Sequence, residues 1–588
     1  MERKTLLAIL LIFVVLIGAQ VLQGLYLREK RRHLPPPSPP AAGSPEAGSD
    51  TATGQAPGSA PGTAPGTGAP APTTGAPAAP TPPAALQAEA GPTVLRAVPA
   101  PALERKLEGD GFEVTFTSQG GSISHWVLGH YRDPVRRART VDLVPEGARA
   151  LHVIVRTGYG EFDFSDAPFA LLEHDPVAGR IAFAAQDSSG LRVEKRYRLT
   201  PDRKLLDLDL RVSAPPELGA LTYRLGWAAP LPITELQGHL QDHQGVAFLG
   251  QKLLKEQTVP RGKPKKTEIL ETGNVRWVGQ RSRYFVAAVI PDSASVNEAV
   301  LEYRGWTPDA GPEVPLPGRD LVAASAWLAG GAPPGTEIAR RSRIYAGPIR
   351  YESLQSLNVG LESLANLGWK WLVPVSVVLL QLLNLLYKLI PNYGVAIVIV
   401  SALTKLVFYP LTQSSLRTMK VMHRLQPQVE ELRQKYKSDP TKMNQVMMKL
   451  YKDNKVNPLG GCLPMLLQIP VFFALYNVLL FSIELRAAPF VGYIQDLSAP
   501  DVLMRIGGFG LSLMPIVMTG SSYLLQWQTP VDPRQKVTMY LMPLIMLLFM
   551  YTFPSGVIIY WTVNNILSAL QQWLVNRAED RRVAMEAA

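Results

Sequence analysis

Long apolar stretches separated by polar segments give this chain the pattern of a protein with several membrane-spanning helices. About 20 consecutive apolar residues are enough to cross a bilayer as a helix. The stretches that reach or approach this length are 6–27, 369–390, 393–411, 464–483, 506–525, 537–553 and 557–575. Only a short Pro-Ser-Gly connection separates the last two, so we expect them to form an antiparallel pair of helices.

The first apolar stretch, 6–27, follows Arg3 and Lys4. Two interpretations fit this arrangement, an uncleaved membrane anchor and a secretory signal peptide. The stretch is long for the apolar part of a signal peptide, and no clear small-x-small cleavage site follows it. We therefore expect residues 1–33 to form an N-terminal transmembrane anchor.

The next segment, 34–93, consists mainly of Pro, Ala, Gly, Thr and Ser. Because it has almost no large apolar residues, it cannot bury enough surface to offset the entropy lost on ordering. The composition therefore predicts a disordered linker.

In residues 94–347 the pattern of apolar and polar positions changes to a period of two residues. Apolar and polar residues alternate in 112–116 and 206–212, which is typical of strands with one buried face. Many short strands without helical patterns between them predict an all-β sandwich. Four histidines of this region, His125, His130, His152 and His174, lie far apart and show no metal-ligand spacing. The segment also contains no nucleophile elbow and no phosphate-binding loop.

The charge of the polar segment 412–463 sets the membrane topology. Within 412–461 there are ten Lys and Arg against four Asp and Glu, which gives +6. A loop this basic stays in the cytoplasm. If the N-terminus is also cytoplasmic, the first span places 94–347 outside, and only one of the stretches 369–390 and 393–411 can cross back.

A polar stripe decides between these two stretches. Gln381, Asn384 and Lys388 recur at helical spacing and share one face. We therefore expect 348–391 to be an amphipathic region at the outer membrane surface and 392–411 to be the second span. Four further helices in 464–576 and a cytoplasmic tail at 577–588 complete a six-span protein with both termini inside.

The basic segment itself predicts two helices. Apolar stripes lie at Leu425, Val429, Leu432 and Tyr436, and again at Met443, Met447 and Leu450. A Ser-Asp-Pro sequence at 438–440 provides a turn between them. Stripes that face each other in this way predict a helical hairpin projecting into the cytosol.

Lys405 is the residue of most chemical interest. It lies about seven residues, or roughly 10 Å, from the cytoplasmic end of its span, where a lysine costs about 2.5–3.5 kcal/mol to insert. No span contains a carboxylate that could pair with it, so we expect a hydrated cavity open to the cytosol. Other polar residues that could line this cavity are Ser401, Thr404, Gln468, Asn477, Asn564, Ser568 and Gln571. The alternative is that these side chains only link helices through hydrogen bonds.

Composition narrows the possible functions. The net charge of +11 does not by itself indicate nucleic-acid binding, because the basic residues flank apolar segments. Cys462 is the single cysteine, which excludes an intramolecular disulfide and a Cys-based zinc site. The spans lack Asp, Glu and His, which argues against a proton-coupled transporter. We predict no catalytic residue, metal site or cofactor.

Several motifs closely resemble those of the YidC membrane protein insertases of Gram-negative bacteria. The most specific is 457–476, Asn-Pro-Leu-Gly-Gly-Cys-Leu-Pro-Met-Leu-Leu-Gln-Ile-Pro-Val-Phe-Phe-Ala-Leu-Tyr. Shorter matches are Tyr-Pro-Leu-Thr at 409–412, Leu-Gln-Pro at 425–427 and Phe-Pro-Ser-Gly at 553–556. The resemblance implies a periplasmic β-supersandwich followed by a five-helix conserved core.

The resemblance also implies a function and a set of partners. Members of this family insert, fold and help assemble membrane proteins in the bacterial inner membrane, alone or with the Sec translocon. The implied partners are nascent membrane proteins, Sec components, membrane lipids and the ribosome, the last through the cytoplasmic loops and tail.

Two parts of the family's substrate path correspond to residues of this chain. The family has one positive groove residue, usually Arg, and Lys405 occupies its position. The apolar surface along which substrates slide corresponds to Ile469, Pro470, Phe472, Tyr560 and Trp561. Trp561 stands where the family has a tyrosine, so a role for that hydroxyl is absent here.

Two other function classes remain open at this stage. One is a channel or transporter that uses Lys405 to attract anions. The other is an envelope enzyme acting through the β domain, which resembles sugar-binding sandwiches but has no defensible pair of acids. The substrates, the oligomeric state and any β-domain ligand are not predicted by the sequence.

Overall fold

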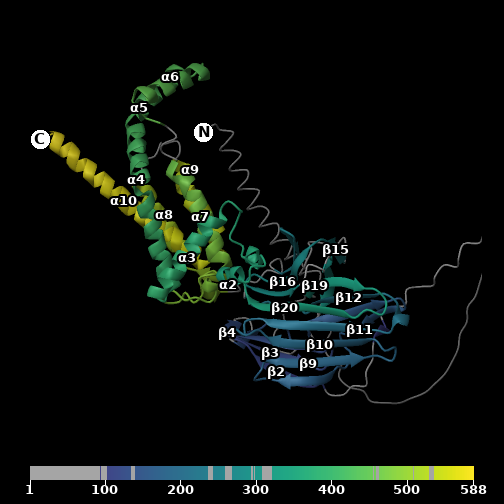
Figure 1. Ribbon diagram of the computed structural model, residues 1–588. Coiled ribbons are helices and arrows are strands. Elements are labelled where there is room, and N and C mark those ends of the chain that lie inside the picture. Colours follow the sequence, from purple (N-terminus) through teal and green to yellow (C-terminus); the bar gives the residue numbers. More distant parts are fainter. Residues whose placement is uncertain are drawn as a thin grey trace, which may run out of the picture. The chain divides into compact units, whose positions relative to one another are not determined.

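The computed structural model describes residues 93–94, 102–133, 139–235, 243–257, 268–292, 296, 298–306, 321–454, 456–457, 463–506, 509–528 and 536–587 (Figure 1). The predicted anchor at 1–33 lies outside these residues, and so does nearly all of the predicted linker at 34–93.

The first part of the described chain is built from β-sheets. One sheet has the order β1 (Thr93–Val94), β7 (Gly160–Asp163), β6 (His152–Thr157), β12 (Leu221–Trp227), β19 (Leu321–Ala332), β18 (Glu298–Trp306) and β15 (Glu268–Thr272). A larger sheet has the order β14 (Lys252–Gln257), β13 (Gln244–Leu249), β16 (Val275–Arg281), β17 (Phe285–Pro291), β20 (Ile338–Pro348), β11 (Leu206–Ser213), β10 (Arg192–Leu199), β9 (Arg180–Gln186) and β8 (Ala170–Asp175). A smaller sheet contains β2 (Glu104–Glu108), β3 (Phe112–Thr117), β4 (Ser122–Asp133) and β5 (Arg139–Asp142).

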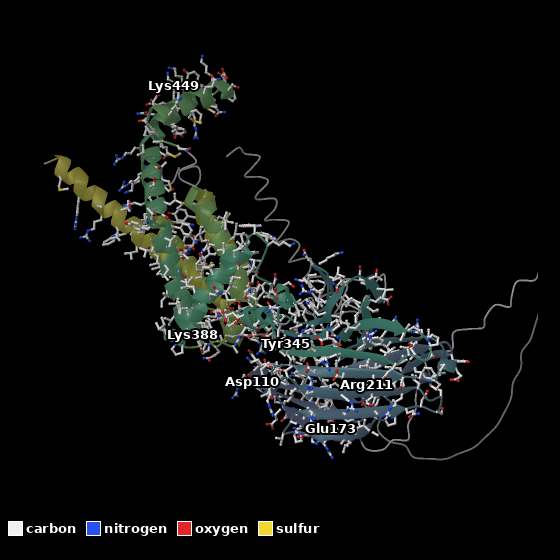
Figure 2. All side chains as sticks on the ribbon, viewed as in Figure 1. Asp110, Glu173, Arg211, Tyr345, Lys388 and Lys449 are labelled. Carbon is white, nitrogen blue, oxygen red and sulfur yellow. The ribbon has the colours of Figure 1, made fainter. Side chains whose placement is uncertain are left out.

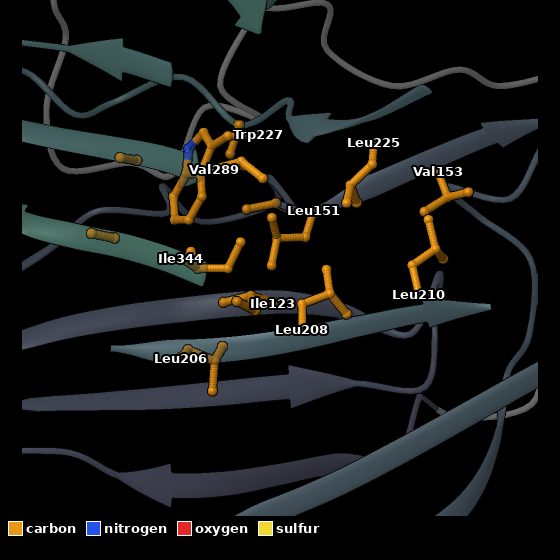
Figure 3. Packing of buried hydrophobic residues seen from close by; sticks show 14 of the residues in the cluster. Ile123, Leu151, Val153, Leu206, Leu208, Leu210, Leu225, Trp227, Val289 and Ile344 are labelled. Atoms are coloured by element: carbon orange, nitrogen blue, oxygen red, sulfur yellow. The ribbon is translucent and has the colours of Figure 1, made fainter. Parts of the chain in front are cut away.

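The core of this domain follows from the alternating sequence pattern. Along β11, Leu206, Leu208 and Leu210 are fully buried, while the residues between them are partly exposed. Figure 3 shows these leucines with Leu225 of β12 and Val289 of β17 in one cluster of apolar side chains. The prediction of an all-β domain over 94–347 is therefore confirmed in its fold class.

Helices make up most of the chain after the β domain. They are α2 (Tyr351–Ser356), α3 (Val373–Leu389), α4 (Tyr393–Arg424), α5 (Gln426–Lys435), α6 (Pro440–Asp453), α7 (Leu463–Phe481), α8 (Met514–Trp527), α9 (Lys536–Met550) and α10 (Ser555–Ala587). Among the described residues, only α4 is by itself both long enough and apolar enough to cross a membrane, and α3, with parts of α7 and α9, forms shorter apolar helices. The six-span count therefore remains a prediction.

One predicted span is wrong at its N-terminal end. The stretch 506–525 was expected to be a helix throughout, but β21 (Val502–Ile506) and β22 (Phe509–Ser512) form a hairpin there. The helix α8 begins only at Met514, with Pro515 in its first turn. Glycines in this part of the sequence explain the difference, because glycine lowers helix propensity.

Two other helices are longer than expected. α4 continues past the expected boundary at 411 to Arg424 and contains Pro410 within its length. α10 continues through most of the expected tail at 577–588.

The basic segment forms both expected helices, α5 and α6. Asp439 begins α6 by accepting a hydrogen bond from the backbone N–H of Lys442 at 3.0 Å, which is the usual role of an N-cap residue. Val429 of α5 is buried, whereas no residue of α6 is buried among those described. Figure 2 labels Lys449 on this exposed helix.

Candidate functional site

Lys405 of α4 is partly buried and faces α10. Its ammonium nitrogen donates a hydrogen bond to Oγ of Ser568 at 2.6 Å, and Ser568 donates in turn to the backbone carbonyl of Asn564 at 2.7 Å. In the part of the chain that the structure describes, no carboxylate forms an ion pair with Lys405. The hydrogen-bond partner of the partly buried ammonium group is therefore a neutral hydroxyl.

A second group of hydrogen bonds links α7 to α10 nearby. Tyr560 accepts a hydrogen bond from Nε2 of Gln468 at 2.6 Å and another from Nδ2 of Asn564 at 3.3 Å. Tyr560, Asn564 and Ser568 recur every four residues on α10, so they share one face of that helix. Together with Lys405 and Gln468 they form one continuous polar network across α4, α7 and α10.

Three predicted cavity residues make other contacts. Ser401 donates to the carbonyl of Ile397, and Thr404 donates to the carbonyl of Ser401. Such bonds to the preceding turn are common for Ser and Thr within helices. Asn477 donates to the carbonyl of Phe473. The structure therefore shows no direct bond between these three side chains and the Lys405 network.

Gln571 differs from the other predicted residues in its hydrogen bonding. Its side chain is buried, and neither its amide nitrogen nor its amide oxygen has a hydrogen-bond partner among the described residues. It lies three residues after Ser568, on the same face of α10.

The residues of the predicted sliding surface lie on α7 and α10. Ile469 is 40% exposed, and Pro470 is partly buried within α7. The rings of Phe472 and Trp561 meet edge to face, with centroids 5.0 Å apart. Tyr560 is only 2% exposed, and its ring centroid lies 6.5 Å from that of Phe472. Its ring therefore packs against this surface and contributes little exposed area to it.

A second polar contact of α10 was not predicted from the sequence. Nδ2 of Asn565 donates to the hydroxyls of Ser521 at 3.0 Å and Ser522 at 2.8 Å, both on α8. Of the neighbouring asparagines, Asn565 therefore bonds to another helix, whereas the side chain of Asn564 bonds to Tyr560 of α10 itself. The adjacent pair of amides in an apolar stretch was the available signal, because each needs a partner.

Several ionisable groups of the β domain have perturbed pKa values, and two of them are His125 and Lys195. A hydrogen bond from Nδ1 of His125 to the Asp142 carboxylate, at 2.6 Å, raises the pKa of the histidine. Lys195 is fully buried, and desolvation lowers its pKa to about 7. Among the described residues, no group of His, Cys, Asp and Glu is placed to hold a metal ion.

Comparison with known proteins covers both parts of the chain. The family model of the 60Kd inner membrane protein matches residues 385–582, and that of the YidC periplasmic domain matches residues 105–377. A crystal structure of an active YidC insertase shares 17% identity, covers 79% of this chain and 91% of its own, and has a TM-score of 0.34.

Curated relatives match over most of their length. The membrane protein insertase YidC of Syntrophus aciditrophicus is 33% identical over 484 residues, which is 79% of this chain and 83% of that protein. The YidC of Geobacter metallireducens is 32% identical, covering 87% of this chain and 93% of its own. This chain belongs to the YidC family of membrane protein insertases.

Proposed function

We propose that this protein inserts hydrophobic proteins into the bacterial inner membrane and helps them fold and assemble, through a hydrated groove with the positive charge of Lys405. The observation that carries this proposal is the neutral partner of that lysine. Because Ser568 supplies a hydroxyl and no negative charge, the ammonium keeps its attraction for an acidic group that arrives from outside.

The proposed mechanism has two physical parts. The polar tail of a substrate must leave water in order to cross the bilayer, and a hydrated, positively charged groove lowers the cost of that step for an acidic tail. The apolar helix of the substrate then leaves sideways along Ile469, Pro470, Phe472 and Trp561. Burial of its apolar surface in lipid drives this second part.

The same proposal includes location and partners. The matching family is described as an inner membrane protein with a periplasmic domain, which supports a periplasmic position for the β domain. We propose that the basic segment and the C-terminal part of α10 lie in the cytoplasm, where positive loops remain, and contact the ribosome. The Sec translocon and membrane lipids complete the proposed partners.

The test compares variants of Lys405 in proteoliposomes. The substrate is a single-span protein with a short acidic tail, and protease protection of that tail reports insertion. We expect Lys405→Arg to retain insertion, because it keeps the charge. Lys405→Glu should reduce insertion by at least about tenfold, as expected for loss of a hydrogen bond to a charged group together with like-charge repulsion.

A matched control makes the same charge change elsewhere. Lys388 is exposed on α3, so Lys388→Glu should leave insertion unchanged. Full insertion by Lys405→Glu would refute the charge mechanism. The alternative of an anion channel predicts solute flux across vesicles that contain the protein but no substrate, and a tight bilayer with active insertion excludes it.

A further inference from the structure

The Tyr560 hydroxyl makes two hydrogen bonds within the polar network, although the residue is almost completely covered. It is 2% exposed and belongs to the apolar cluster formed by α3, α4, α7 and α10. Burying a hydroxyl without a partner in such surroundings costs about 1–3 kcal/mol. The two amides that reach Tyr560 remove this cost, and they also fix the position of its oxygen.

The hydroxyl joins two helices. Gln468 comes from α7, whereas Asn564 lies one turn further along α10. The tyrosine oxygen acts here as an acceptor, and both amide groups donate to it. The hydrogen bond between α7 and α10 at this level therefore depends on one oxygen atom, beside the ring contacts of Phe472 with Tyr560 and Trp561.

This contact is connected to the charged end of the network. From Tyr560 to Ser568 the helix rises about 12 Å, at about 1.5 Å per residue. Asn564 lies midway and takes part at both ends, because its side chain donates to Tyr560 and its backbone carbonyl accepts from Ser568. Ser568 is the residue that holds the Lys405 ammonium.

We propose that Tyr560 is a positioning residue whose hydroxyl holds α7 and α10 together and so places Ser568 opposite Lys405. This inference rests on the proposed insertase function. It assigns to Tyr560 a role different from that of Trp561, whose ring is partly exposed beside Phe472. Without the hydroxyl, two amides lose their partner while the aromatic packing remains.

Two substrates and five variants of the full-length protein test the proposal. The substrates differ only in their tail, which is acidic in one and carries the corresponding amides in the other. The variants are Tyr560→Phe, Gln468→Leu, their combination, Lys405→Gln and the control Tyr476→Phe. Tyr476 is a suitable control because it lies on α7 and its ring packs against Phe472 and Phe553. Tyr476→Phe removes one hydroxyl group, which is the same chemical change as Tyr560→Phe.

We expect Tyr560→Phe to reduce insertion of the acidic substrate by about 3- to 10-fold, the range for a net hydrogen-bond contribution. Insertion of the neutral substrate should remain at the wild-type level, since it does not use the charge. Gln468→Leu removes one of the two hydrogen bonds that Tyr560→Phe removes, so its loss should be similar or smaller, and the combined variant should lose no more than Tyr560→Phe alone. Tyr476→Phe should resemble wild type with both substrates.

The outcomes separate a positioning role from a structural one. If Tyr560→Phe lowers insertion of both substrates equally, the helix bundle is damaged and the proposal is overturned. If insertion of both substrates stays at the wild-type level, the proposal is overturned as well. If Tyr560→Phe fails to fold, Gln468→Leu still measures the same bond. If Lys405→Gln leaves the acidic substrate unaffected, the proposed charge mechanism itself fails, and the role of Tyr560 fails with it.

Discussion

Replacing Lys195 by methionine should remove a pH dependence from the stability of the β domain. Lys195 lies in β10 with no exposed surface, and its ammonium donates to the carbonyls of Gly120 and Leu151 at 2.7 and 2.8 Å. The ring of Phe169 lies 5.3 Å from the same nitrogen. Asp163 is the one charge that favours the protonated form, and its effect is smaller than that of desolvation.

The sign of the effect follows from proton binding in the two states. Burial lowers the pKa of Lys195 from 10.5 to about 7, so between these pH values the unfolded chain holds a proton that the folded chain has released. Stability therefore rises with pH across this window and is constant below it. Each pKa unit corresponds to about 1.4 kcal/mol, so the rise from about pH 7 to about pH 9.5 is roughly 3 kcal/mol.

The assay is urea unfolding of the detergent-solubilised protein, followed by the fluorescence of tryptophans buried in the β domain. Trp126, Trp227 and Trp277 are fully buried there. We expect the free energy of unfolding to rise with pH in the wild type and to change less in Lys195→Met. Lys255, whose pKa burial lowers to about 8, contributes equally in both proteins. Identical pH dependence in the two proteins would refute the reasoning.

Two further substitutions probe buried polar contacts. Arg486 is 3% exposed at its side chain and donates to the Glu235 carboxylate at 2.6 Å, so Arg486→Met should cost about 3–5 kcal/mol in thermal unfolding by leaving a buried carboxylate unpaired. A change below about 1 kcal/mol would contradict this role. Asn565→Leu removes two bonds to serines of α8 and should lower stability by about 1–3 kcal/mol in detergent; Ile566→Ala, at an exposed position of α10, is the control, and equal losses would contradict the prediction.

The face of α10 that meets Lys405 could be predicted from spacing alone. Asn564 and Ser568 are four residues apart, which places them on one side of a helix before any tertiary contact is known. Because the lysine had no acidic partner in any span, the expectation was a hydrated cavity that Asn564 and Ser568 could line. The structure shows a direct bond from Lys405 to Ser568, which the spacing did not specify.

Other parts of the site were not predictable because they depend on competition between local and tertiary bonds. Ser401 and Thr404 lie on the same turn of α4 as Lys405, but their hydroxyls bond within the helix. Short hydroxyl side chains reach the preceding carbonyls without help from other helices. Ser568 makes the same bond to its own helix and also accepts from Lys405. Spacing along a helix therefore indicates which residues share a face, and the packing of the facing helix decides which of them a long side chain such as that of lysine meets.

Lys195 shows a similar limit in the β domain. It stands within an alternating strand, and local pattern alone would allow its side chain to point to solvent. Its two carbonyl partners are 75 and 44 residues away in sequence, and Leu151 adopts a left-handed backbone with φ 64°. The sequence around Gly120 and Leu151 therefore does not indicate that their carbonyl groups accept hydrogen bonds from a distant lysine.

The partner of Lys405 has a consequence for the proposed mechanism. A carboxylate fixed beside the lysine would be worth more than a hydroxyl to the resting protein, because opposite charges attract strongly where water is scarce. The same carboxylate would occupy the ammonium and compete with every acidic substrate. A serine compensates part of the burial cost and leaves the charge unneutralised. The insertase function proposed here therefore favours a weaker resting partner, and placing an aspartate at 568 should stabilise the bundle while it lowers insertion of acidic substrates.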